Sequence, residues 1–421
     1  MTHDLVLSRA RLLAGDGPPA APAATGWVAV DGGRVTALGT GVPPDGATRV
    51  DLDGDWLAPG FVDVHVHGGA GGDVMADDPA ARVAVRRVHA QHGTTAMLAS
   101  TVSRPADELL AAVTRLAEDA ESGQEADDAG EPLARLLGIH LEGPFLSAAR
   151  RGAHEESALR DPDPDEVDRL LAAGRGWIRT ITLAPELPGG LDLVRRLVAA
   201  GVTVSLGHTD ADADTLRAAV DAGARAITHT FNCMRPLHHR RPGGVGVAMD
   251  SPELTCELIL DLVHVDPAAA RVLVRAAAGR VCLITDAMAA AGMSDGRYEL
   301  GGQVVEVSDG QARVSGTTTL AGSTLTMATA VHNAVAHLGL DVPTAVSMAT
   351  TVPAGLLPGV DAGRLHVGGP ADLVRLDGQA HLGGVWIAGR PVVGSVSVDS
   401  STDADPTDRT VDPAKEVTRV R

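Results

Sequence analysis

Two histidines separated by one residue, His65 and His67, end an apolar run in the string GFVDVHVHGG at residues 60–69. Side chains at positions i and i+2 of a β-strand point to the same side, so both imidazoles can reach one metal ion if the run is a strand. The spacing alone is weak evidence, because 16 histidines in 421 residues give roughly 0.6 such pairs by chance. The place of the pair, at the end of a buried run, strengthens the interpretation.

Four further imidazoles or carboxylates follow other short apolar runs: Glu142 in HLEGP, His208 in SLGHT, His229 in THTFN and Asp286 in LITDA. Each alone has a structural explanation, such as a hydrogen-bonded histidine in the core or, for Asp286, a helix N-cap. Core packing does not account for such groups at the ends of five different runs. We therefore interpret them together as metal ligands with a carboxylate beside them.

This set of groups predicts the chemistry of amide hydrolysis. Imidazole and carboxylate ligands suit Zn²⁺, and also Fe²⁺, Co²⁺ or Mn²⁺. A metal in such a site lowers the pKa of a bound water molecule to about 7 and polarises a carbonyl group. A carboxylate next to the metal can take a proton from the water and pass it to a leaving amine.

The composition excludes several classes of partner. The net charge of −19 disfavours nucleic acid and anionic membranes, which need a basic surface, but not a small phosphorylated substrate. No uninterrupted apolar stretch reaches about 18 residues, so no membrane span is expected. The three cysteines lack CxxC spacing, and the N-terminal residues lack a signal-peptide pattern, so we expect a cytoplasmic protein.

The middle of the chain repeats a strand–helix unit. Short β-rich runs are expected at 60–66, 94–101, 135–141, 178–183, 202–207, 226–231, 255–262 and 281–286. Segments rich in Ala, Arg and Leu with helical spacing lie between most of them. Eight such units in about 300 residues predict a (β/α)8 TIM barrel of the α/β class. A doubly wound sheet is the alternative, but it does not explain why the reactive groups gather at the ends of the runs.

Both ends of the chain differ from the middle. Residues 1–57 and 360–397 alternate apolar and polar positions between Gly and Asp turns, which predicts one small β-sandwich built from both termini. The barrel domain is then expected at 58–359. Residues 398–421 are rich in Asp, Ser and Thr with few apolar positions, which predicts a disordered tail.

Several longer strings make the chain resemble the N-acetylglucosamine-6-phosphate deacetylases of the amidohydrolase superfamily, over about residues 1–395. The strings are PGFVDVHVHG, HLEGPF, RGAH, SLGHT, THTFNCM, RRPGGVG, LITDAMAAAG and LAGST. Many amidohydrolases bridge two metals with a carbamylated lysine. The only lysine of this sequence is Lys415, so a bridge here must be a carboxylate, for which Glu142 is placed, or water.

The resemblance implies a role for each matching residue. Glu142, His208 and His229 would hold the principal metal, and His65 and His67 a second one, with Glu142 bridging and Asp286 near both. Asp286 would be the general base and then the acid, and His264 would help to polarise the acetyl carbonyl. The remaining implied groups contact the sugar phosphate: His154, Asn232, the backbone of Cys233, and Arg240, which in this family often reaches across a dimer interface.

The family implies one or two divalent ions per subunit, zinc first, a phosphorylated amino-sugar substrate and a homodimer. The sequence departs from the family at two places. Cys233 follows the asparagine of the THxxN string where alanine is usual, and Leu262 replaces glycine in the Asp-Gly-x-His string. A leucine there narrows any close approach of the backbone. The change at Cys233 matters little if the contact is made by its backbone amide, so we expect the departure at Leu262 to affect the choice of sugar more than the reaction.

Other readings remain open at the level of sequence. The nearest is a deacetylase of N-acetylgalactosamine 6-phosphate, or another amidohydrolase with a different amide substrate. A non-catalytic barrel scaffold or a sugar-phosphate binding module is disfavoured, because every implied ligand position and Asp286 are filled. His140 can orient a ligand or simply pack in the barrel, and the role of His238 and His239, in the loop before Arg240, is open.

Overall fold

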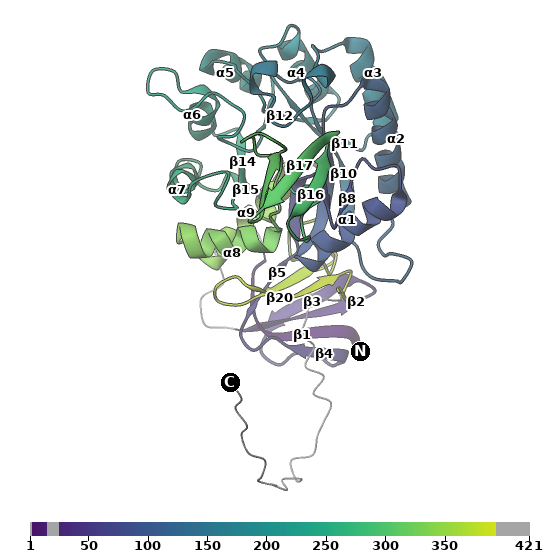
Figure 1. Cartoon of the computed structure of the whole chain (residues 1–421). Helices are drawn as coiled ribbons and strands as arrows, with labels where there is room; N and C mark the ends of the chain where they lie inside the picture. The colour runs from purple at the N-terminus through teal and green to yellow at the C-terminus, as the bar shows by residue number, and fades with distance from the viewer. Residues whose placement is uncertain (1, 15–24, 393–421) are drawn as a thin grey trace, which may run out of the picture.

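The computed structural model describes residues 2–14 and 25–392, and it has the predicted architecture of a parallel barrel above a small sheet domain (Figure 1). Neighbouring barrel strands pair in parallel and follow one another in chain order. They are β6 (Phe61–Val66), β9 (Thr94–Thr101), β10 (Arg135–Glu142), β11 (Ile178–Leu183), β12 (Thr203–Leu206), β13 (Ala226–Ile227), β14 (Thr255–Ile259) and β15 (Val281–Ile284).

The last strand meets the first just beyond their ends. The amide of Asp286 donates to the carbonyl of His65 at 2.9 Å, and the amide of His67 donates to that of Ala287 at 2.9 Å. Buried Asp63 in β6 ties the same two strands, because its Oδ2 accepts from the hydroxyl of Thr285 at 2.6 Å. The nearly closed barrel thereby places the strand ends in a ring, which is where TIM-barrel enzymes build their active sites.

Several barrel strands are shorter than predicted, and β13 and β14 end furthest before their predicted ends. Strand β13 ends at Ile227 and β14 at Ile259, where the sequence pattern predicted 231 and 262. The backbone soon turns into the left-handed region, with φ of +29° at His229, +84° at Phe231 and +65° at Leu262. A strand ladder cannot continue through such residues. The apolar pattern persists because these turns pack against the barrel.

Helices surround the barrel strands and begin at recognisable signals. Asp78, Asp163 and Asp266 each accept a hydrogen bond from the backbone amide two residues on, and each precedes a proline at the first helical position. Asp–Pro is a strong helix start because the side chain caps a free amide and proline has none to cap. The helices are α1 (Pro79–Gln91), α2 (Ala106–Ser122), α3 (Pro164–Gly174), α4 (Gly190–Ala199), α5 (Ala213–Asp221), α6 (Gly243–Asp250), α7 (Pro267–Ala276), α8 (Met327–Leu338), α9 (Val342–Met348) and α10 (Thr351–Gly355). None of these described helices is long and apolar enough to cross a membrane.

The small domain combines strands from both ends of the chain, as predicted. Strand β19 pairs antiparallel with β5, so Leu373 lies opposite Pro59, and the two parts share a core around Leu57 and Trp386. Strand β5 spans the predicted boundary at 57/58, so the chain passes into the barrel without a linker. The strands are β1 (His3–Leu12), β2 (Gly26–Asp31), β3 (Arg34–Thr40), β4 (Gly46–Asp51), β5 (Trp56–Pro59), β19 (Leu373–Leu376), β20 (Leu382–Ile387) and β21 (Arg390–Pro391). The predicted tail, 398–421, lies outside the described residues.

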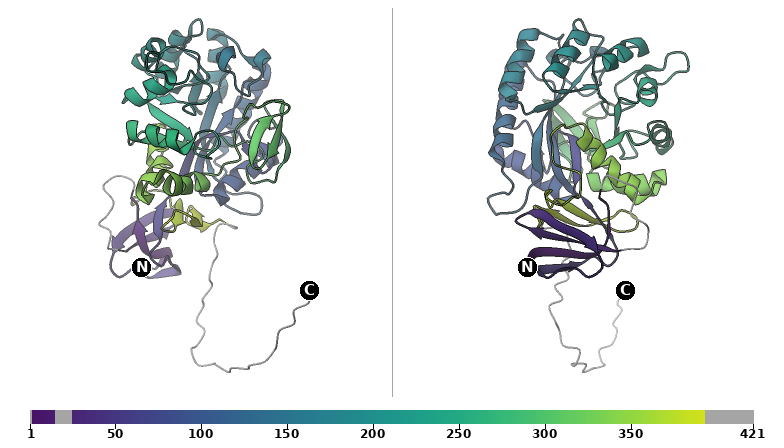
Figure 2. Two further views of the ribbon diagram at one scale, coloured as in Figure 1. Left: turned by 60° about the vertical axis from the view of Figure 1, so that its left-hand side comes forward. Right: turned by 180° about the vertical axis from the view of Figure 1, so that it is seen from behind.

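The sequence analysis missed a three-stranded antiparallel sheet between β15 and α8. It consists of β16 (Gly296–Leu300), β17 (Gln303–Ser308) and β18 (Gln311–Val314), and its arrows stand at the outer edge of the barrel in the left view of Figure 2. Its apolar face packs on Val102 and Met288, which follow β9 and β15. It therefore forms one wall of the space above the strand ends.

Candidate active site and metal centre

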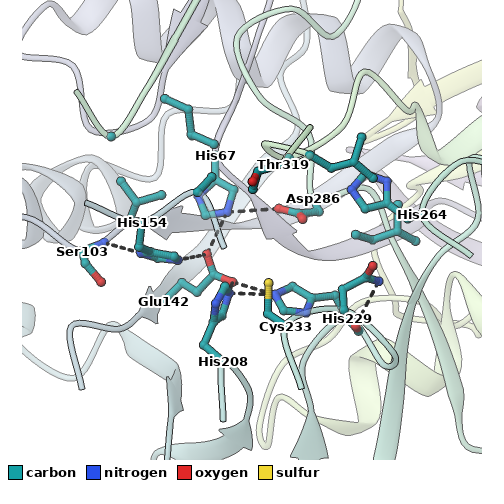
Figure 3. Close-up of a pocket in the computed structure, with 18 of the residues that line it drawn as sticks. His67, Ser103, Glu142, His154, His208, His229, Cys233, His264, Asp286 and Thr319 are labelled. Atoms are coloured by element: carbon teal, nitrogen blue, oxygen red, sulfur yellow. Dashed lines mark hydrogen bonds and ion pairs between the residues drawn. The ribbon is translucent and has the colours of Figure 1, made fainter. Parts of the chain in front are cut away.

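One carboxylate lies at the centre of the strand ends. Glu142, the last residue of β10, is 4% exposed. Its two oxygens face five imidazoles, those of His65, at 3.4 Å, and four that are labelled in Figure 3. Oε1 lies 3.2 Å from His208 Nε2 and 3.1 Å from His229 Nε2. Oε2 lies 3.2 Å from His154 Nε2 and 3.3 Å from His67 Nε2. A single carboxylate thus touches ligand candidates from several different strands.

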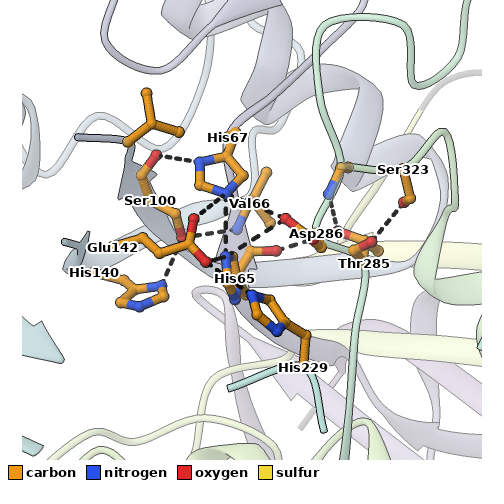
Figure 4. Close-up of polar contacts among 12 residues, drawn as sticks. His65, Val66, His67, Ser100, His140, Glu142, His229, Thr285, Asp286 and Ser323 are labelled. Carbon is orange, nitrogen blue, oxygen red and sulfur yellow. Dashed lines mark hydrogen bonds and ion pairs between the residues drawn. The ribbon is translucent and has the colours of Figure 1, made fainter. Parts of the chain in front are cut away.

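The predicted ligands form two neighbouring groups. Glu142, His208 and His229 make one, and His65, His67 and Asp286 make the other; within each, the ligand atoms lie within 4.8 Å of one another. Asp286 Oδ1 is 3.2 Å from His67 Nε2 and 3.5 Å from His65 Nε2. Figure 4 shows the second group beside Glu142, which lies between the two. The convergence of imidazoles and carboxylates fits a divalent metal centre.

The other ring nitrogens of these histidines show that the donor sets fit a divalent metal. Nδ1 of His67 lies 2.9 Å from the carbonyl of Ser100, and Nδ1 of His208 lies 2.9 Å from that of Arg150. A carbonyl only accepts, so each Nδ1 carries a proton, and Nε2 is the nitrogen that can bind a metal once it has lost its own proton. The Nε2 atoms of His65 and His67 lie 3.1 Å apart. Such convergence of ring nitrogens and carboxylates is the ligand chemistry of zinc and related metals.

The backbone turns these side chains inward at a cost. His208, His229 and Asp286 have φ of +48°, +29° and +50°, a region that residues other than glycine rarely adopt. Each lies within two residues of the end of its strand, where the change in φ redirects the chain. Strain of this kind persists only where the surrounding structure enforces it, and it is concentrated at functional sites.

The charges of the cluster shift one another's pKa values. Burial by itself would raise the pKa of Glu142, yet His65 and the hydrogen bonds from His154 and His208 hold it well below its ordinary 4.5. Burial would lower the pKa of His67, but Asp286 and Glu142 raise it to about 9. In the metal-free chain the carboxylates are therefore ionised and stabilised by protonated imidazole.

These shifts predict how the stability of the metal-free chain depends on pH. The folded pKa of His67, about 9, lies above its ordinary 6.5, so its contribution is complete below pH 6.5 and is lost as the pH rises through 9. The free energy of unfolding of the chelated protein should fall by roughly 2–3 kcal/mol across this window. Thermal unfolding at several pH values measures it.

The zinc-loaded protein is the control for this pH series. Because ligands must lose their protons to bind a metal, its melting temperature should hold or rise over the same window. If the melting temperature of the chelated protein stayed level between pH 6.5 and 9, the raised pKa of His67 in the folded chain would be contradicted.

The pocket above the two groups contains most of the predicted substrate residues. His154, Asn232, Cys233 and His264 line it together with Glu142, His208, His229 and Asp286. His154 contacts Glu142 directly, and its Nδ1 accepts from the amide of Ser103 at 3.2 Å. Nδ1 of His264 lies 2.7 Å from Oδ2 of Asp261, so Nε2 is the ring nitrogen that Asp261 does not contact. The side chain of Asn232 donates to the carbonyl of His229 at 3.2 Å.

Among the predicted substrate-contacting residues, Arg240 is the one that does not belong to the described lining of this pocket. It lies in an exposed loop, where its guanidinium contacts His239 at 3.0 Å. No Arg or Lys occurs among the described residues that line the pocket. Within one chain, therefore, the described pocket has no guanidinium or ammonium group for a phosphate.

No sequence pattern predicted two parts of the site, one in the wall of the pocket and one beneath the ligand groups. The wall formed by the extra sheet contributes Leu300, Gly301, Thr318, Thr319 and Leu320. Alternating apolar positions at 296–314 could have signalled its strands. Glu257 in β14, 1% exposed, touches the cluster from below, with Oε2 3.2 Å from His65 Nδ1. No motif includes Glu257. The only signal in the sequence is that a charged residue interrupts an apolar run that is expected to be buried.

Leu262 does not narrow the pocket as the sequence analysis expected. It has φ of +65°, packs against the barrel core and is not among the described pocket-lining residues. The physical reason is that the turn after β14 directs the side chain into the core and leaves His264 to face the pocket. We expect Leu262→Gly to change KM for the substrate by less than about twofold. Steady-state kinetics would show it, and a large change in KM would place Leu262 at the substrate.

The chain is similar to a known protein family along most of its length. The model of the Amidohydrolase family matches residues 56–413. The N-acetylglucosamine-6-phosphate deacetylase of Vibrio furnissii is 38% identical over 80% of this chain and 82% of its own length. This chain belongs to the N-acetylglucosamine-6-phosphate deacetylase family of amidohydrolases.

Other members of the deacetylase family agree with this placement. The N-acetylgalactosamine-6-phosphate deacetylase of Escherichia coli O157:H7 is 39% identical over 83% of this chain and 91% of its own. A solved variant of the Mycobacterium smegmatis N-acetyl-D-glucosamine-6-phosphate deacetylase, in complex with N-acetyl-D-glucosamine-6-phosphate, is 41% identical. It matches with a TM-score of 0.85 over 93% of this chain and all of that one. An enamidase at 17% identity and a TM-score of 0.58 shares the fold alone.

Proposed function

We propose that this amidohydrolase removes the acetyl group of N-acetyl-D-glucosamine 6-phosphate, producing D-glucosamine 6-phosphate and acetate in amino-sugar catabolism. The observation that carries the proposal is the position of Asp286. Its carboxylate lies 3.2 Å from His67 Nε2 in a buried ligand group, and the same residue lines the pocket with His264 and His154. The carboxylate that would act as the base therefore lies both beside the imidazoles of a candidate metal group and in the wall of the pocket.

The residues of the chain divide the reaction among them. Glu142, His208 and His229, with His65 and His67, would hold one or two divalent ions, zinc in our proposal, with iron, manganese or cobalt as alternatives. When bound, the metal supplies polarisation of the acetamide carbonyl and lowers the pKa of water. Both ligand groups are at most 8% exposed, which strengthens every charge interaction there.

Proton transfer falls to Asp286. Its carboxylate accepts a proton from the water that attacks the acetamide carbon. As the C–N bond breaks, the same oxygen returns the proton to the nitrogen, which leaves as the amine, while the acyl carbon leaves as acetic acid. The acid then gives its remaining proton to the amine, so the products are acetate and the ammonium form of the sugar phosphate. His264, whose Nδ1 is held by Asp261, would contact the carbonyl oxygen through Nε2 and help to polarise it as negative charge develops there.

We propose that the phosphate is bound across a homodimer. The described pocket residues include no Arg or Lys, whereas Arg240 lies in an exposed loop together with Leu237, which is 51% exposed. A guanidinium binds phosphate through two parallel hydrogen bonds, so Arg240 of a second subunit would complete the site. The sugar would rest against His154, Asn232 and the backbone of Cys233.

We also propose that the enzyme works in the cytoplasm. All three cysteines are free in the structure, and Cys256 and Cys282 are buried. Reduced, unpaired thiols are typical of proteins that work in a reducing compartment.

N-acetylgalactosamine 6-phosphate is the second candidate substrate, because the relative from Escherichia coli O157:H7 named for that sugar is as similar as those named for the glucosamine derivative. The test is acetate release from both sugar phosphates, with protein as purified, after chelation, and after addition of Zn²⁺, Fe²⁺, Mn²⁺ or Co²⁺. Turnover that chelation abolishes and metal restores supports the proposal, and the ratio of kcat/KM values decides the epimer. Metal binding without turnover of either sugar would refute the proposed substrate.

A further inference from the structure

A buried carboxylate beneath the site has no role in the proposed reaction. Glu257 lies in β14 and is 1% exposed. Its Oε2 lies 3.2 Å from Nδ1 of His65, and the same oxygen accepts from the backbone amide of His229 at 3.4 Å. One side chain thus touches a member of each candidate metal group from the side away from the pocket.

The partner of His65 differs in charge from the partners of the other ligands. Nδ1 of His67 and of His208 each meets a neutral backbone carbonyl, whereas Nδ1 of His65 meets a carboxylate. A carboxylate on the far nitrogen fixes the ring and makes Nε2 a stronger donor to a metal than a carbonyl does. Since the Nε2 atoms of His65 and His67 already lie 3.1 Å apart, the orientation of His65 decides whether both can face one ion.

Core packing alone is a poor explanation for Glu257. A buried carboxylate is costly unless hydrogen bonds satisfy it, and the two donors described above both come from the metal-ligand set. The second buried carboxylate nearby, Asp63, provides a contrast. Its contacts are the hydroxyl of Thr285 at 2.6 Å and the backbone amides of Thr285 and His65. Asp63 therefore holds the strands, while Glu257 holds a ligand ring.

We propose that Glu257 is a positioning residue that sets the metal affinity of the group His65, His67 and Asp286, and so decides whether this chain binds a second ion. The proposal rests on the proposed metal-dependent function and deepens it. The backbone contact to His229 is a single weak hydrogen bond, so the group of Glu142, His208 and His229 should depend on Glu257 much less.

The test measures metal binding and needs no substrate. Wild type, Glu257→Gln and Glu257→Ala are freed of metal, equilibrated with buffered Zn²⁺ over a range of free concentrations, and analysed for metal per chain. Cobalt absorption spectra provide a second readout. We expect two binding events in wild type, with the weaker affinity reduced at least about 10-fold in Glu257→Gln, and further in Glu257→Ala. The tighter event should be unchanged.

Two controls identify the affected group and exclude general damage to β14. Cys256→Ala changes the neighbouring residue, whose Sγ contacts the carbonyl of Ala248, away from the ligands; it should bind both ions as wild type does. The substitution His67→Asn removes a ligand from the group of His65, His67 and Asp286. In that background, Glu257→Gln should cause no further loss of metal affinity. Melting temperatures of the metal-free variants check that each is folded.

The possible results distinguish a failure of the positioning role of Glu257 from a failure of the proposed function. Two ions bound with wild-type affinities by Glu257→Gln would overturn the role of Glu257 and leave the proposed function standing. Equal weakening of both events, or the same loss in Cys256→Ala, would also overturn it, since both would indicate a structural effect. A wild-type chain that binds no divalent metal would refute the proposed function and the positioning role together.

Discussion

Replacing Asp286 with asparagine should lower kcat for acetate release by about 10³-fold, the scale of a lost general base and acid. Asparagine has nearly the same shape but cannot accept the proton from water or return it to the amine. The backbone there has φ of +50°, which asparagine adopts as readily as aspartate. The change therefore removes the charge without adding strain. Rates are measured with saturating sugar phosphate and metal.

Asp309→Asn is the matched control for this substitution. Asp309 also has φ of +50° but lies exposed in the turn between β17 and β18. It should retain wild-type turnover. Metal analysis of Asp286→Asn should still find an ion at Glu142, His208 and His229. If Asp286→Asn kept turnover within about tenfold of wild type, another group would have to move the proton.

Replacing Glu142 with glutamine should remove metal and turnover together. Its oxygens contact His67, His154, His208 and His229, so neutralising it weakens the ligand group to which it belongs and the one beside it. We expect a loss of metal affinity of about 100-fold or more and turnover below about one thousandth of wild type. Metal analysis after dialysis and acetate release measure the two effects.

Glu166→Gln supplies the comparison for a buried glutamate elsewhere. Glu166 in α3 is 6% exposed and pairs with Arg160 at 2.5 Å, away from the pocket. Breaking that pair should cost stability, on the order of 3 kcal/mol, without changing metal content. Retention of full metal content by Glu142→Gln would show that Glu142 is not a ligand.

Much of the fold was predictable because its signals are local. Asp78, Asp163 and Asp266, each followed by proline, mark helix starts that depend on nearby backbone amides. The alternation of strand and helix predicted the barrel, and the β-rich ends predicted one small β-sandwich built from both termini. The sheet of β16, β17 and β18 was missed, because short strands with charged outer faces resemble a loop in sequence.

The candidate site also has some features that local sequence patterns predict and others that they do not. His65 and His67 could be paired from spacing alone, since alternate residues of a strand share a face. The neighbours of Glu142 come from residues 12 to 87 positions away in the sequence, and only the closure of the barrel brings them within hydrogen-bonding distance. The resemblance to known deacetylases supplied those assignments before the geometry did.

The sequence by itself determined the repeating units, the identity of the reactive side chains and their positions near the ends of apolar runs, because period, capping and residue type are properties of neighbours along the chain. Only the tertiary structure decided that Glu257 supports His65, that Leu262 turns into the core and that Arg240 lies outside its own pocket. Each of these depends on the direction of a side chain at a turn or on the distance between strands. Such quantities are set when the barrel closes, and no local pattern encodes them.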